Sequence, residues 1–170
     1  HAITCYTKAT QYQPKWEIGF AFLGQANSSQ GNLDQAIEAY EKAISLNPDS
    51  AETHYNMGNG LADIGKLDEA IEAYQKALSI DPNYADAYQS MAAVLQMQGE
   101  LKDAIKFYKK ALSLNPELAE TYNNLGVSLE AHGELSAAKT SYKKALAIKP
   151  NFVAAFCNLG RVQLNLGAFK

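Results

Sequence analysis

Small and aromatic side chains recur along the chain at spacings of four and then three residues, as in Ala36, Tyr40 and Ala43. Residues three and four apart lie above one another on a helix, so this spacing predicts a helix with one apolar face. The pattern returns every 34 residues, and its tyrosines are Tyr6, Tyr40, Tyr74, Tyr108 and Tyr142. Each apolar face must be covered, so the pattern predicts a series of helix pairs.

Turn-forming residues keep the same period and mark where the helices end. A proline ring disfavours helical geometry in the residue ahead of it, so one helix of each pair ends before a proline. The five prolines are Pro14, Pro48, Pro82, Pro116 and Pro150. The other helix is predicted to end at a left-handed glycine. These glycines are Gly31, Gly65, Gly99, Gly133 and Gly167.

A further glycine lies inside most of the first helices, at Gly24, Gly58, Gly126 and Gly160, with Ala92 at the equivalent position of another pair. Glycine in a helix interior costs about 1 kcal/mol relative to alanine, so its repeated use requires a packing reason. We expect the two helices of a pair to cross closely at this residue.

The stretch LNPDSAETHYNMGNGLADIGKLDEAIEAYQKALSIDP resembles the tetratricopeptide repeat family at every small, aromatic and turn position. The resemblance implies an all-α α-solenoid, in which antiparallel helix pairs stack into a right-handed superhelix with a concave groove. It also implies a protein-interaction scaffold with no catalytic residues and no cofactor. In this frame the chain is a single array, whose segments are 1–16 (a second helix), 17–50, 51–84, 85–118 and 119–152 (full repeats), and 153–170 (a first helix).

In this family the first helices line the groove, which implies a set of residues that contact a peptide or protein partner. They are Tyr55, Asn56, Asn59, Gln89, Ser90, Asn123, Asn124, Asn158 and Arg161. A carboxamide both donates and accepts hydrogen bonds, so a row of asparagines could bind the backbone of an extended peptide. The row at Asn56, Asn124 and Asn158 is similar to the asparagine ladder of O-linked N-acetylglucosamine transferases. The alternative is that these asparagines only bond a neighbouring helix.

Neither end of the chain has a polar capping helix, so we expect a segment of a longer array. Three functions stay open: a peptide-binding scaffold, a substrate-recruiting module of a larger enzyme such as a glycosyltransferase, and head-to-tail self-association. The residues assigned to self-association are Ala2, Tyr6, Phe156, Leu159 and Phe169.

The formal charge of -3 and the pI near 5.6 disfavour nucleic acid as a partner. The apolar runs are too short for a membrane span, and no His and Cys cluster has the spacing of a metal site. The weakly constrained expectation for localisation is cytoplasmic, and Cys5 and Cys157 are expected to be buried or half-buried thiols. The lysine pairs 109–110 and 143–144 are interpreted as a solvated face, because the same face earlier in the chain could form the pairs Glu38–Lys42 and Glu72–Lys76.

Overall fold

The computed structural model describes residues 1–168, and these residues form ten α-helices and no strand. The helices are α1 (Ala2–Tyr12), α2 (Glu17–Ser28), α3 (Leu33–Leu46), α4 (Ala51–Asp63), α5 (Leu67–Ile80), α6 (Ala85–Met97), α7 (Leu101–Leu114), α8 (Ala119–Ala131), α9 (Leu135–Ile148) and α10 (Val153–Ala168). Within these residues no helix is long and apolar enough to cross a bilayer. The fold is an all-α solenoid of helix pairs.

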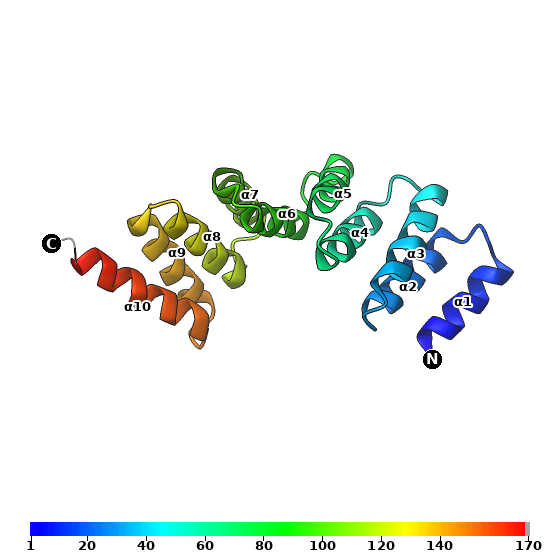
Figure 1. Cartoon of the computed structure of the whole chain (residues 1–170), viewed down its shortest axis with the longest axis horizontal. Coiled ribbons are helices and arrows are strands. Elements are labelled where there is room, and N and C mark those ends of the chain that lie inside the picture. The colour runs from blue at the N-terminus through cyan, green and yellow to red at the C-terminus, as the bar shows by residue number, and fades with distance from the viewer. Residues whose placement is uncertain (169–170) are drawn as a thin grey trace. The chain divides into compact units, whose positions relative to one another are not determined.

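The helices gather into two compact units, the first from His1 to Asn83 and the second from Tyr84 onward. Unit 1 contains α1 to α5 and unit 2 contains α6 to α10, and within each unit every helix packs on the next one along the chain (Figure 1). The repeat boundaries given above stay a prediction, and we use them only to compare equivalent positions.

The turn between the two helices of a pair depends on glycine, as predicted. Gly31, Gly65, Gly99 and Gly133 have φ values between 77° and 88°, a left-handed conformation that a Cβ atom disfavours. The prediction for Gly167 is wrong, because α10 continues through it to Ala168.

The close crossing inside each pair is confirmed at three glycines. An added Cβ on Gly24, Gly58 or Gly126 would lie 2.5 to 2.7 Å from the Cε1 atom of the tyrosine on the facing helix, closer than real side chains approach. These tyrosines, together with Tyr108, are at most 2% exposed. Each pair is therefore centred on a buried tyrosine ring that packs against the backbone of its partner helix.

Three of the five proline turns are held by the side chain of the residue that precedes the proline. The Oδ1 atoms of Asn47, Asp81 and Asn115 accept hydrogen bonds from the backbone N–H two residues later, at 2.9 to 3.2 Å. Such a side-chain turn replaces backbone hydrogen bonds that the proline interrupts. Lys149 precedes the last proline and has no side-chain acceptor for the same bond.

Two expectations about side chains are wrong. Cys5 and Cys157 are both exposed free thiols, because they lie on the outer faces of α1 and α10. The pairs Glu38–Lys42 and Glu72–Lys76 are not formed, whereas Lys149–Glu120 at 3.5 Å and Arg161–Glu130 at 2.9 Å are ion pairs among the described residues. His54 is a packing residue, 8% exposed, with its Nε2 atom 3.0 Å from the Pro48 carbonyl oxygen.

Candidate functional site

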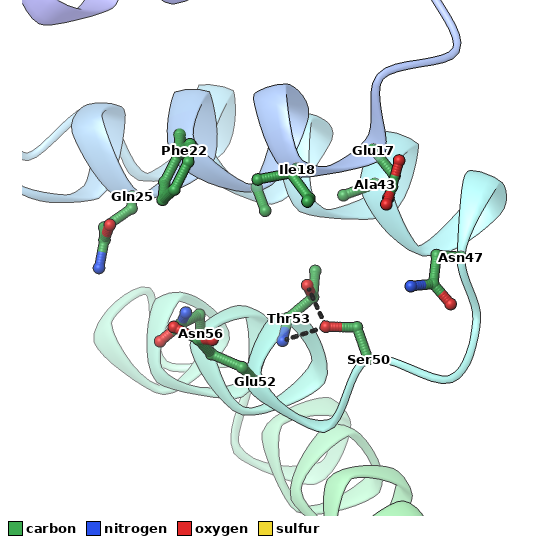
Figure 2. Close-up of a pocket in the computed structure, with 11 residues that line it drawn as sticks. Glu17, Ile18, Phe22, Gln25, Ala43, Asn47, Ser50, Glu52, Thr53 and Asn56 are labelled. Atoms are coloured by element: carbon green, nitrogen blue, oxygen red, sulfur yellow. Dashed lines mark hydrogen bonds between the residues drawn. The ribbon is translucent and has the colours of Figure 1, made fainter.

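Unit 1 contains an open pocket of about 220 Å³ between the first helices of two successive pairs, α2 and α4. In Figure 2, Ile18 and Phe22 come from α2 and face Thr53 and Asn56 of α4 across this space. The complete lining is Glu17, Ile18, Ala21, Phe22, Gln25, Ala43, Asn47, Ser50, Glu52, Thr53 and Asn56. We call it the α2–α4 pocket.

In the α2–α4 pocket, small residues occupy positions at which unit 2 carries long polar side chains that join its helices. There, the Thr121 hydroxyl donates to the side-chain oxygen of Gln89, which joins α8 to α6. The residue equivalent to Gln89 in unit 1 is Ala21, which cannot reach across. Thr53, which is equivalent to Thr121, is instead bonded to Ser50: their hydroxyl oxygens are 2.8 Å apart, and the Thr53 N–H donates to Ser50 Oγ at 3.3 Å.

The two units also differ at a second position, where unit 2 again has a hydrogen-bonding side chain and unit 1 a small residue. In unit 2, Gln96 Oε1 accepts hydrogen bonds from Ser128 Oγ at 2.8 Å and from Tyr108 Oη at 3.1 Å. The residue equivalent to Ser128 in unit 1 is Gly60, so the corresponding bond between α2 and α4 is not possible. Hydrogen bonds thus join α6 to α8, and the space beside them is lined by polar residues such as Asp86, Gln89 and Glu120, whereas the α2–α4 pocket has the apolar wall of Ile18 and Phe22.

The α2–α4 pocket combines an apolar wall with a polar rim. Ile18 and Phe22 are 50% and 43% exposed, and the Phe22 ring is supported from behind by the Tyr6 ring, 5.6 Å away and stacked. The rim carries the carboxylates of Glu17 and Glu52. Such a pocket suits an apolar side chain whose neighbours are polar or basic.

The charge of Glu52 acts on the tyrosine beneath it. Burial raises the pKa of Tyr40 from 10.0 to about 12, and the nearby Glu52 carboxylate contributes in the same direction. A negative charge next to an ionising phenol disfavours the phenolate, so the tyrosine stays neutral at physiological pH.

Of the residues predicted in unit 1, only Asn56 lines the pocket. Asn59 accepts a hydrogen bond from Tyr74 Oη at 2.8 Å, and the Tyr55 ring lies 6.1 Å from the Tyr74 ring. Tyr55 and Asn59 therefore both contact the buried tyrosine of their own helix pair.

Four of the residues predicted in unit 2, Asn123, Asn124, Asn158 and Arg161, belong to a connected polar network on α8 and α10. Asn158 Nδ2 donates to Asn123 Oδ1 at 3.0 Å, and Asn123 Nδ2 donates to Asn124 Oδ1 at 3.3 Å. Asn123 is 7% exposed, so it holds its neighbours in place from below. Gln89 is bonded to Thr121 as described, and Ser90 is half-buried on α6. Asn158 thus bonds a neighbouring helix and Asn124 a residue of its own helix, while both keep part of their surface exposed.

Arg161 is the chain's only arginine, and Glu130 holds it at the edge of this network. Its Nη2 atom donates to Glu130 Oε2 at 2.9 Å and to Asn158 Oδ1 at 3.2 Å. Tyr142 Oη also donates to Glu130 Oε2, at 2.9 Å, and burial followed by this hydrogen bond raises the pKa of Tyr142. One carboxylate therefore orients a guanidinium and a buried phenol together.

The residues assigned to self-association lie on α1 and α10. Ala2 is exposed, whereas Tyr6 is half-buried against Phe22. Phe156 is 69% exposed, and Leu159 packs against the core of unit 2. Phe169 lies outside the described residues. The sequence interpretation missed the apolar wall of the α2–α4 pocket, although Ile18 and Phe22 are apolar residues at groove positions and could have signalled it.

Comparisons with known proteins agree with this architecture. The family model described as "TPR repeat" matches residues 24–62, 58–99, 97–133 and 129–167. A crystal structure of MamA is similar over 87% of this chain and 86% of its own, with 31% sequence identity and a TM-score of 0.83. The structure of YrrB, described as a TPR protein with an unusual peptide-binding site, is 25% identical over 95% of this chain and 84% of its own, with a TM-score of 0.81. A search of curated proteins found no match. Among residues 1–168 no group of three His, Cys, Asp or Glu side chains is arranged to hold a metal ion.

Proposed function

The chain belongs to the tetratricopeptide repeat family and is a protein-interaction module, and from that premise we propose that its α2–α4 pocket binds an extended peptide segment of a partner protein. The observation that carries the proposal is the exposed pair Ile18 and Phe22, which faces hydrogen-bonding side chains of α4. The description of YrrB as peptide-binding supports the same class of ligand.

The chemistry of the pocket selects a particular kind of segment. One apolar side chain of the peptide lies against Ile18 and Phe22. The amides of Gln25 and Asn56 then bond its backbone, and the carboxylates at the rim favour a lysine or arginine next to the apolar residue.

The experiment introduces into the pocket the glutamine that unit 2 carries at the position equivalent to Ala21. Peptides are first selected from a random library with the wild-type protein, and their affinities are measured by fluorescence polarisation. Ala21→Gln copies Gln89 and places a long side chain opposite Thr53. We expect affinity to fall at least tenfold, about 1.4 kcal/mol or more, because the ligand space is occupied.

Ala147→Gln is the matched control, since it makes the same chemical change at an exposed residue of α9 that does not line the pocket. It should leave affinity unchanged. Peptides that bind the Ala21→Gln variant as tightly as wild type would rule out the pocket as their site.

A second contact surface is proposed on unit 2, at Asn124 and Asn158. The observation that favours it is that Glu130 and Asn123 hold Arg161 and Asn158 in fixed positions while part of each remains exposed. An ordered amide and guanidinium lose little entropy on binding a peptide backbone. Replacing Asn124 and Asn158 with alanine should weaken binding of the selected peptides, and unchanged affinity would exclude this surface. A relation to the repeat domain of O-linked N-acetylglucosamine transferases rests on this row alone and stays a proposal.

The remaining hypotheses are tested separately. Self-association through α1 and α10 predicts a molar mass that rises with concentration in light scattering, and that Phe156→Ser abolishes the rise; a constant monomer mass excludes it. Recruitment to a larger enzyme predicts catalytic domains in the parent gene beside this segment. Absence of catalysis by the segment itself and a cytoplasmic location also stay proposals.

A further inference from the structure

Unit 2 has a groove on its second-helix side, away from the residues discussed so far. Helices α7 and α9 form its walls and α8 its floor, and it encloses about 520 Å³. Its lining is Lys109, Leu112, Ser113, Tyr122, Leu125, Leu129, Ala137, Thr140, Ser141 and Lys144. We call it the α7–α9 groove.

Unit 1 contains an equivalent groove of about 530 Å³ between α3 and α5. Every residue of the α7–α9 groove has its counterpart there 68 residues earlier in the sequence. The counterparts are Glu41, Ile44, Ser45, His54, Met57, Leu61, Glu69, Glu72, Ala73 and Lys76, and Ile37 and Lys66 complete the lining. The two grooves have the same construction, so their difference lies in side-chain chemistry.

That difference is one of charge. Lys109 of unit 2 replaces Glu41 of unit 1, and the uncharged pair Ala137 and Thr140 replaces two further glutamates. Both grooves carry two lysines, but the unit 1 groove also has glutamates on both walls, while the unit 2 groove has no carboxylate in its lining.

The surrounding helices extend this contrast. Helices α7 and α9 carry seven lysines and a single carboxylate, Asp103. Helices α3 and α5 carry six carboxylates and two lysines. Neither Lys109 nor Lys144 takes part in the ion pairs formed among residues 1–168, and Lys144 Nζ lies over the Tyr122 ring at 5.3 Å. The positive charge of the α7–α9 groove is therefore not neutralised within the protein, and the interpretation as a merely solvated face does not account for a charge difference between equivalent positions.

The floor of the groove indicates which kind of anion fits. It is made of the side chains of Leu112, Leu125 and Leu129, which are at most 8% exposed, with Tyr122 and Ala137 half-buried beside them. A nucleic-acid backbone has nothing to place on an apolar floor, and the Tyr122 ring already has a lysine over its face. A flat lipid surface does not reach into a groove between two helices. An amphipathic protein segment satisfies both features, because it offers apolar side chains on one face and carboxylates beside them.

We propose that the α7–α9 groove docks an acidic amphipathic segment of a partner protein, with apolar side chains on the leucine floor and carboxylates paired to Lys109 and Lys144. The unit 1 groove rejects the same segment, because its glutamates would face the partner's carboxylates. The chain then has two separate interaction surfaces, one on the first helices of unit 1 and one on the second helices of unit 2.

The test uses two synthetic 16-residue peptides with leucines at helical spacing, one with glutamate and one with lysine at all other positions. Binding to the full chain is measured by fluorescence polarisation at low and high salt. We expect the glutamate peptide to bind, with an affinity that falls as salt rises, and the lysine peptide not to occupy the groove. The double substitution Lys109→Glu and Lys144→Glu should lower the affinity for the glutamate peptide at least tenfold, about 1.4 kcal/mol.

Two further variants separate the groove from general charge attraction. Lys110→Glu with Lys143→Glu makes the same change in net charge at lysines of the same helices that do not line the groove, and it should retain most of the binding. Glu41→Lys with Glu69→Ala and Glu72→Thr installs the unit 2 residues in unit 1, and it should raise the stoichiometry from one peptide to two. Circular dichroism checks that each variant is folded.

The proposal is overturned if the control pair of lysines matters as much as the groove pair, or if the three-residue exchange adds no second site. It is also overturned if single-stranded oligonucleotides or phosphatidylserine vesicles bind through Lys109 and Lys144 more tightly than the peptide does. Because the α2–α4 pocket lies on other residues, the Ala21→Gln variant should bind the glutamate peptide normally, so the two proposed sites can fail independently.

Discussion

Two glycines of α4, only two residues apart, should respond in opposite directions to the same substitution. A Cβ added to Gly58 would lie 2.7 Å from Cε1 and 2.8 Å from Cδ1 of Tyr74. A Cβ added to Gly60 would have Ile37 Cγ1 as its nearest neighbour at 3.6 Å, an ordinary van der Waals contact. Both glycines are buried and helical with negative φ, so alanine suits the backbone of either one.

The magnitude follows from two opposing terms. Alanine gains about 0.5 to 1 kcal/mol over glycine inside a helix. Forcing a side chain into a packed core costs about 1 to 3 kcal/mol. Tyr74 cannot simply withdraw, because it is 1% exposed and its hydroxyl is bonded to Asn59. We therefore expect Gly58→Ala to destabilise the protein by about 1 kcal/mol and Gly60→Ala to stabilise it by about 0.5 to 1 kcal/mol.

The assay is urea unfolding of both variants beside wild type, followed by circular dichroism and by tyrosine fluorescence so that separate unfolding of parts of the array is detected. The midpoints should lie on opposite sides of the wild-type midpoint. Ala92→Gly tests the converse in unit 2, where an alanine already faces the tyrosine of its pair, and should lower stability. Equal stabilisation by both alanine substitutions would refute the close crossing as the reason for the glycine at position 58.

Three further outcomes are expected. Gln96→Ala removes the acceptor of the fully buried Ser128 hydroxyl and should cost about 1 to 3 kcal/mol in urea unfolding; a cost near zero would mean that the bond contributes nothing. Because the pKa of Tyr40 is raised from 10.0 to about 12, the unfolded chain loses this proton before the folded one, so stability should be constant below pH 10 and fall between pH 10 and 12. Tyr40→Phe should reduce that fall, and an unchanged pH dependence would contradict the assignment. Cys5 and Cys157 should both react with a thiol reagent in the native protein as fast as in urea, whereas slow native labelling would contradict their exposure.

Most of the fold could be predicted from the sequence because its determinants are local and repeated. A proline stops a helix wherever it occurs, and a glycine such as Gly31 is needed wherever a left-handed turn follows a helix. The one turn that was wrong, at Gly167, lies in α10, where no second helix follows within the described residues and the helix simply continues.

The candidate site could be predicted less well because it depends on contacts between repeats rather than on any one repeat. The walls of the α2–α4 pocket are not joined by a hydrogen bond like that of unit 2 because Ala21 is short where Gln89 is long, and neither residue has this effect without the helix opposite. In the same way, the position of Asn123 in its repeat predicts a surface residue. In the structure Asn123 is buried, and the side-chain amide of Asn158 in the next helix pair donates a hydrogen bond to Asn123 Oδ1.

Arrays of near-identical repeats face the danger that a helix docks onto the wrong neighbour during folding, since each one presents almost the same apolar face. The serine partner of Gln96 acts against this error. If α4 took the place of α8 against α6, Gly60 would stand where Ser128 belongs and Gln96 would lose the Ser128 donor. Gln96 thus makes α8 distinguishable from α4, so at least one junction of the array specifies which helix it accepts.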